Sequence, residues 1–200
     1  MFKVVSIIKS SVYRFQFLNL YILLFILSAL FVVSCEPKNE YQQRLETELS
    51  KDIRVDSLFL GYYLGMSQEE FYEHSWQLNK QEIVTGQQTI HYKLENLKSP
   101  ASMEFYPQFK EGQIYQMPVE IHYDGWAPWN RDLFADSLMV DVAQLYEEKY
   151  SADFFQAIHP ESQKKALIDI QGNRRISIFK RDDRILTIEF LDLTAVENNL

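Results

Sequence analysis

The chain is poor in the residues that build covalent cross-links and metal sites, since its 200 residues include one Cys, six Gly and six Pro. A single Cys excludes an internal disulfide and any Cys-rich metal site. Few Gly and Pro, with 46% hydrophobic residues, exclude collagen-like and low-complexity classes. Basic residues are also scarce, at 20 against 28 acidic ones, and the resulting net charge of −8 argues against nucleic acid as a partner.

Sequence motifs of common enzymes are missing as well. The chain has no G-x-S-x-G, G-x-G-x-x-G, P-loop or H-E-x-x-H motif. Neighbouring carboxylates at 69–70, 147–148 and 182–183 fall on expected helix faces or turns, where solvation explains them. We therefore expect a protein that is not an enzyme and that needs no cofactor.

The first 35 residues differ chemically from the rest, because they contain three basic residues and no acidic one. An apolar run over residues 15–34 follows the basic lead-in. This order is typical of an export signal. The run is close to the roughly 20 residues that cross a bilayer, so a retained membrane anchor is the alternative. Both interpretations place the remaining chain on the same side of the membrane.

The end of the apolar run, Val32-Val33-Ser34-Cys35, resembles the signal of bacterial lipoproteins. The resemblance implies a signal peptide over residues 1–34, cleavage between Ser34 and Cys35, and a diacylglyceryl group on the Cys35 thiol, with acylation of the freed amine. The membrane is then a partner through this lipid anchor. In such proteins an Asp after the Cys commonly retains the protein at the inner membrane. Glu36 stands there instead, which favours the outer membrane of the cell envelope, facing the periplasm or the surface.

Residues 35–56 are densely polar and have almost no apolar periodicity. The pattern predicts a flexible or partly helical tether between the lipidated Cys35 and a globular domain over residues 57–200. A short helix over residues 41–49 is the alternative.

The globular region begins with a helix signal at Ser67 and Glu70, which have the spacing of a capping box. This predicts a helix over residues 68–79, with four apolar members: Phe71, Tyr72, Trp76 and Leu78. A second helix is predicted over residues 133–150.

Strands are predicted after each helix from alternating apolar and polar residues. The expected strands cover residues 88–94, 102–109, 115–123, 154–158, 166–171, 175–180 and 184–193. Pro107 and Pro118 cannot donate to a sheet ladder, so they indicate an edge or a bulge. The predicted fold is α+β, with helices packed on an antiparallel sheet, as one domain or as two similar helix-plus-strands halves.

A second resemblance involves Leu64-Gly65-Met66-Ser67-Gln68-Glu69-Glu70. The segment is similar to a helix start in the small lipoprotein of the outer-membrane β-barrel assembly machinery and in β-lactamase-inhibitor-like proteins. The segment 145–150 is similar to a helix end in such proteins, although Ser151 replaces their Gly. The resemblance implies a helix-plus-sheet binding fold without catalytic residues.

Two surface features are candidates for partner binding. Basic residues concentrate near the end of this acidic chain, at Arg174, Arg175, Lys180, Arg181 and Arg184. They indicate either an anionic partner or the protection of an edge strand by charge, and we favour edge protection.

Trp126 and Trp129, in a Pro-containing loop, are the second feature. They fit either contact anchors for a protein or sugar, or a plug at the end of the sheet.

A metal site is weighed at His91 and His122, with Glu120 or Glu95 as a third ligand. Both histidines fall on the polar phase of predicted strands, so we favour surface residues and expect no metal.

The sequence thus predicts an envelope lipoprotein that binds or scaffolds a protein or an envelope polymer. A periplasmic inhibitor or ligand-binding module and an envelope hydrolase are the alternatives.

Overall fold

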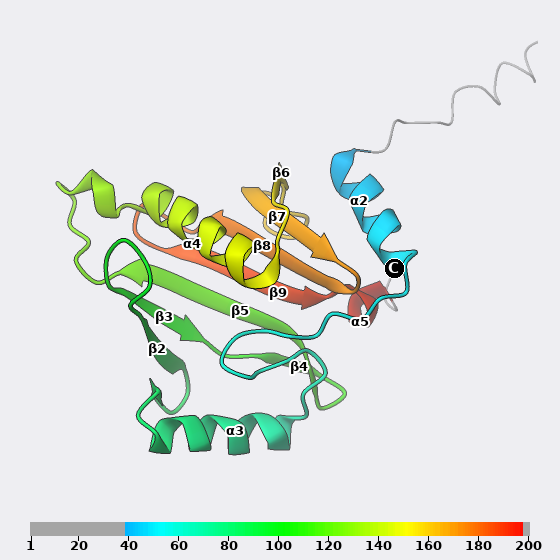
Figure 1. Ribbon diagram of the computed structural model, residues 1–200, viewed down its shortest axis with the longest axis horizontal. Helices are drawn as coiled ribbons and strands as arrows, with labels where there is room; N and C mark the ends of the chain where they lie inside the picture. Colours follow the sequence, from blue (N-terminus) through cyan, green and yellow to red (C-terminus); the bar gives the residue numbers. More distant parts are fainter. Residues whose placement is uncertain (1–38, 198–200) are drawn as a thin grey trace, which may run out of the picture. The chain divides into compact units, whose positions relative to one another are not determined.

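The computed structural model describes residues 39–197, in which four α-helices and nine strands occur (Figure 1). The strands form one antiparallel sheet in the order β1-β2-β3-β5-β9-β8-β7-β6, and β4 also pairs with β5. The predicted mixed α+β class is therefore confirmed, and the described part of the chain is mostly sheet. The predicted signal over residues 1–34, with Ser34 and Cys35, lies outside the described residues.

The order of the predicted helices and strands is observed, but the strand predicted over residues 102–109 is interrupted at 106–107, and the elements Val84–Thr85 and Leu193–Glu197 were not predicted. The helices are α2 (Glu40–Leu49), α3 (Gln68–Lys80), α4 (Ala135–Tyr150) and α5 (Leu193–Glu197), with a 3-10 turn at Arg131–Leu133. The strands are β1 (Val84–Thr85), β2 (Ile90–Leu94), β3 (Ala101–Phe105), β4 (Gln108–Lys110), β5 (Gln113–Tyr123), β6 (Phe155–Ile158), β7 (Lys165–Gln171), β8 (Arg174–Lys180) and β9 (Leu186–Asp192).

The predicted capping box begins α3. The Ser67 hydroxyl accepts a hydrogen bond from the Glu70 backbone N–H at 3.2 Å, and the Glu70 carboxylate accepts one from the Ser67 N–H at 2.9 Å. Of the predicted apolar members, only Phe71 and Leu78 are buried in α3. The other two, Tyr72 and Trp76, are exposed.

The two prolines lie where the ladder beside β5 is interrupted. Strand β3 ends its pairing at Phe105 opposite Val119, and β4 resumes at Gln108 opposite Gln116. Pro107 lies in this gap on one side, and Pro118 lies between the two pairs on β5. A residue without a backbone N–H costs nothing where no ladder bond is made. The register shift at Gln108 is the predicted irregularity.

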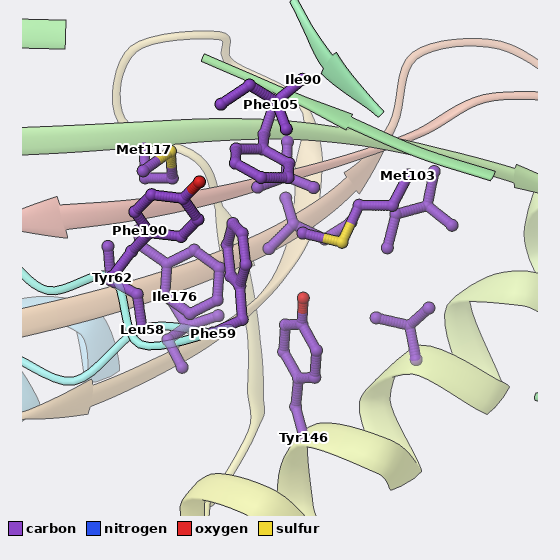
Figure 2. Close-up of a cluster of buried hydrophobic side chains, with 14 of the residues drawn as sticks. Leu58, Phe59, Tyr62, Ile90, Met103, Phe105, Met117, Tyr146, Ile176 and Phe190 are labelled. Carbon is purple, nitrogen blue, oxygen red and sulfur yellow. The ribbon is translucent and has the colours of Figure 1, made fainter. Parts of the chain in front are cut away.

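The main core lies where α4 and the loop before α3 meet the sheet. Figure 2 shows Tyr146, on α4, directed toward the side chains of Phe59 and Phe190. The Tyr146 and Phe190 ring centres are 5.7 Å apart, and Phe59 packs edge-on to Phe105 at 4.8 Å. An edge-to-face pair such as Phe59–Phe105 stabilises a core by about 0.5–1.5 kcal/mol beyond its buried area. The loop is thus part of the core.

The described part of the predicted tether over residues 35–56 is helical and packs on the folded unit. The compact unit begins at Glu40, and residues 40–49 form α2, as the short-helix alternative required. Its apolar side packs against a second core built on β7, through Tyr41, Leu45 and Leu49. The Val55 N–H then donates to the Asn173 side chain at 2.6 Å. The boundary predicted at residue 57 is therefore too late, because three apolar residues spaced four apart were too few to stand out in a polar segment.

Candidate functional site

Arg174 and Arg175 are not surface residues. Each is 1% exposed, and β8 lies between β9 and β7 inside the sheet. Consecutive strand residues point to opposite faces, so Arg174 lies on the side of α4 and Arg175 on the side of α2. Both interpretations of these two arginines, anion binding and edge protection, are wrong. Both guanidinium groups instead form hydrogen bonds with groups inside the protein.

Arg175 is the centre of a buried ionic cluster beneath α2. Its guanidinium donates to Glu189 at 2.7 Å, to Glu161 at 2.9 Å and to the Tyr41 hydroxyl at 2.9 Å. Burial alone would raise the pKa of Glu189, but the hydrogen bond from His159 and the charge of Arg175 outweigh it and lower the pKa. The cluster therefore keeps Glu189 ionised and ties α2 to the sheet.

The same cluster is the one group of potential metal ligands found among residues 39–197. Ligand atoms of His159, Glu161 and Glu189 lie within 4.8 Å of one another. However, the Arg175 guanidinium contacts both carboxylates, through the oxygens that would face a cation. A divalent ion would have to displace a buried arginine, so the arrangement fits an ion-pair network better than a metal site.

A serine, a histidine and a carboxylate also line up in this cluster. The Ser162 hydroxyl is 3.0 Å from His159 Nδ1, and His159 Nε2 is 3.3 Å from Glu189. His159 Nδ1 also accepts the backbone N–H of Ser162 at 3.1 Å, which assigns the ring proton to Nε2. The histidine thus closes the β6–β7 turn, and its lone pair is already engaged by the backbone.

Arg174 holds the loop before α3 against the other face of the sheet. Its guanidinium donates to the Ser57 carbonyl at 2.7 Å and to the Gln171 side chain at 3.0 Å. Its charge lies 5.0 Å from the centre of the Tyr150 ring. Burial lowers the pKa of Arg174, and the nearby Asp169 acts against that. These contacts are structural.

The remaining predicted partner-binding residues lie apart from the buried arginines. Arg181, in the turn between β8 and β9, is exposed and donates to Glu120 on β5 at 2.6 Å. Trp126 is half-buried against Phe134, with ring centres 5.8 Å apart. Trp129 is 86% exposed. The two tryptophans therefore differ: Trp126 packs on the protein, and Trp129 is open to solvent.

The histidine pair weighed as a metal site is not brought together. His91 lies on β2 and His122 on β5, and β3 runs between these strands. His91 pairs instead with Glu104, 3.5 Å away, and His122 lies opposite Ser102. Burial lowers the pKa of His122.

A broad groove of about 720 Å³ runs between α4 and the β6–β7 hairpin. Three lysines lie along it, but the fold already uses two of them. Lys180 pairs with Asp136 at 2.7 Å, and the Lys164 ammonium donates to the carbonyl of Lys180 at 3.1 Å. Within the described residues only Lys165 of the three has no such partner. The charge on the groove is therefore mostly satisfied internally.

A smaller pocket of about 300 Å³ lies between α3 and the β1–β2 edge of the sheet. Three of its aromatic side chains are open to solvent: Tyr72 is 48% exposed, Trp76 51% and Tyr106 37%. The other lining residues are Phe71, Ser75, Asn79, Val84, Thr85, Gly86, Gln87 and Ile90. We call this the α3 pocket. None of these described lining side chains is charged.

The walls of the α3 pocket are held by specific contacts. The hydroxyls of Tyr72 and Tyr106 are 2.9 Å apart, and the Lys80 ammonium lies 3.4 Å from the centre of the Trp76 ring. Gly86, at φ +109°, turns the chain so tightly that a Cβ there would lie 2.0 Å from the Thr89 carbonyl oxygen. Only glycine fits this turn, so the backbone beside the pocket is fixed.

Sequence reasoning missed the α3 pocket because it grouped Tyr72 and Trp76 with Phe71 and Leu78 as apolar members of one helix, without separating its faces. A signal was present, since these two residues are four apart and share a stripe that excludes Leu78. What could not be seen is that β1 and β2 leave that stripe open.

No protein-family model, curated protein or solved structure matches the chain. Among the described helices, none has both the length and the apolar character needed to cross a membrane.

Proposed function

We propose that the chain is a lipid-anchored binding protein of the bacterial cell envelope and that it catalyses no reaction. A signal over residues 1–34 directs export, cleavage frees Cys35, and the lipid on Cys35 holds the protein at the outer membrane. The partner is a protein or an envelope polymer rather than nucleic acid. The folded unit consists of two helix-plus-strands halves, and the order of its elements supports this.

The observation that carries the proposal is the α3 pocket. A fold gains by burying large aromatic side chains, and exposed aromatic clusters mark binding sites. Here Tyr72, Trp76 and Tyr106 border one hollow, while Phe71 and Leu78 supply the buried side of the same helix. Tyr72 and Tyr106 pack against the buried Phe71, with ring centres 5.6 and 5.7 Å from its own, but all three rings keep exposed area at the hollow, and a ligand site explains that exposure.

An envelope hydrolase is the second candidate, and the Ser162–His159–Glu189 alignment favours it. Binding explains more of the molecule. His159 is only 1% exposed, its Nδ1 accepts a backbone N–H, and Glu189 is paired with Arg175. A general base needs a free lone pair toward its nucleophile.

The anchor is tested by metabolic labelling of the full chain with an alkyne fatty acid. We expect labelling of the wild type, and its loss in Cys35→Ala, because the thiol is the acceptor. Ser34→Ala is the matched control, since it keeps a small residue before the cleavage site and should be labelled normally. Equal labelling of wild type and Cys35→Ala would refute the anchor.

The absence of catalysis is tested on the same preparations with a fluorophosphonate probe for activated serines. We expect no labelling of the wild type above that of Ser162→Ala. Labelling that disappears in Ser162→Ala would replace the binding function with hydrolysis.

A further inference from the structure

The lining of the α3 pocket restricts its ligand to neutral molecules. Charged residues make up 24% of the chain, yet none of the described side chains that line this pocket is charged. The lining offers no counter-charge to repay the lost hydration of a charged ligand, which is costly, and the Lys80 ammonium is already engaged over the Trp76 ring. The acidic residues Glu69, Glu70 and Glu73 lie instead along a neighbouring hollow. Tyr72 borders both hollows, and the acidic side chains lie outside the α3 pocket.

The exposed rings suit a ligand that has flat apolar faces. Tyr and Trp side chains offer large, rigid π surfaces that bind C–H groups and positive edges. A pyranose ring presents such C–H groups on its faces, while its hydroxyls point outward around the rim. Trp76 is well placed for stacking, because the Lys80 ammonium fixes its indole from one side.

Polar groups that a sugar needs lie beside these rings. Thr85 and Gln87 line the pocket and are exposed, and their side chains have no hydrogen-bond partner among residues 39–197, while the Thr85 backbone pairs with His91. A glutamine side chain offers both a donor and an acceptor, and a hydroxyl does the same. Two adjacent sugar hydroxyls can satisfy such groups together, whereas an aliphatic peptide side chain would leave them unpaired.

Size and rigidity agree with a small ligand. The pocket volume of about 300 Å³ is at the lower end of the range for small-molecule sites. The Tyr72–Tyr106 hydroxyl contact and the Gly86 turn hold its walls before any ligand arrives. A prepared site loses less conformational entropy on binding.

We propose that the α3 pocket binds a neutral saccharide unit, stacked on Trp76 and Tyr72 and hydrogen-bonded by Gln87. The inference rests on the proposed binding function and names its ligand class. It requires no charged sugar and no metal.

The test uses the full chain, purified in a detergent without a sugar headgroup, on an array of neutral and acidic glycans. We expect neutral glycans to bind and Trp76→Ala to weaken that binding by at least about tenfold. Gln87→Ala should weaken it to a smaller extent. Tyr63→Ala is the matched control, because Tyr63 is an equally exposed aromatic residue outside the pocket and should have no effect.

Fluorescence in the Trp126→Phe, Trp129→Phe background then reports on Trp76 alone, and a bound neutral trisaccharide from the array should shift its emission. Binding of no neutral glycan, or binding that Trp76→Ala leaves unchanged, overturns the saccharide proposal. If an array of apolar peptides binds instead and Trp76→Ala abolishes it, the pocket is a protein-docking site. That result overturns the saccharide and leaves the proposed binding function standing. Loss of the lipid anchor alone affects only the location of the protein.

Discussion

The region beneath α2 and the α3 pocket differ in which side chains they bury: the first buries charged groups, and the second exposes uncharged aromatic rings. Beneath α2 the protein buries charge: Arg175 pairs with Glu189 inside the fold and with the exposed Glu161 at its edge. At the α3 pocket it exposes uncharged aromatic rings, including Trp76, at 51% exposure. Buried charges are costly unless they are paired, so the charged cluster is structural. The rings at the α3 pocket keep exposed area that the packing on Phe71 does not cover, as the proposed ligand site requires.

The largest expected effect concerns the contribution of the buried ionic cluster to folding stability. We expect Arg175→Ala to lower the free energy of unfolding by about 3–5 kcal/mol, because it leaves Glu189 buried without its partner. Arg181→Ala is the control: its pair with Glu120 is exposed, and it should cost less than about 1 kcal/mol. Urea unfolding measures both values. Similar losses for the two variants would contradict the structural role of the cluster.

A part of that loss comes from the unpaired charge. The double variant Arg175→Met, Glu189→Gln removes both charges, so we expect it to be more stable than Arg175→Ala. No recovery would show that packing around the guanidinium dominates.

The pH dependence of stability tests whether the ionised form of Glu189 stabilises the fold. The pKa of Glu189 is lowered in the folded state, so its ionisation stabilises the fold above the unfolded value of about 4.3. This contribution is lost as the pH falls through the lower folded value. Burial raises the pKa of Asp169, which acts in the opposite sense. We therefore expect the difference in stability between wild type and Glu189→Gln to shrink below pH 4, as measured by urea unfolding at each pH.

Glu95→Gln is the matched control for this experiment, because Glu95 is exposed. Its stability should differ from that of wild type by a small, nearly constant amount across the same pH range. A Glu189→Gln curve parallel to the wild-type curve would show that this carboxylate has no linkage to folding.

Local signals made part of the fold predictable. The capping box of Ser67 and Glu70 and the alternation over residues 117–123 of β5 are contained within a few neighbouring residues, and both appear in the structure. The environment of Arg175 is different, since Tyr41 is 134 positions away in the sequence. Two adjacent arginines resemble a surface patch until the strands on both sides of β8 are known. The pocket was missed for the same reason, because its second wall comes from β1 and β2.

The smallest expected effect is the change in folding stability when an exposed aromatic side chain is removed. Trp126 and Trp129 test this in one loop, since Trp126 packs against Phe134 and Trp129 is 86% exposed. We expect Trp129→Ala to change stability by less than about 0.5 kcal/mol, and Trp126→Ala to cost about 1–3 kcal/mol through lost packing. Thermal unfolding of the two variants measures the difference. An equal loss would mean that an exposed ring in this protein still supports the fold, and the contrast with the α3 pocket would lose its basis.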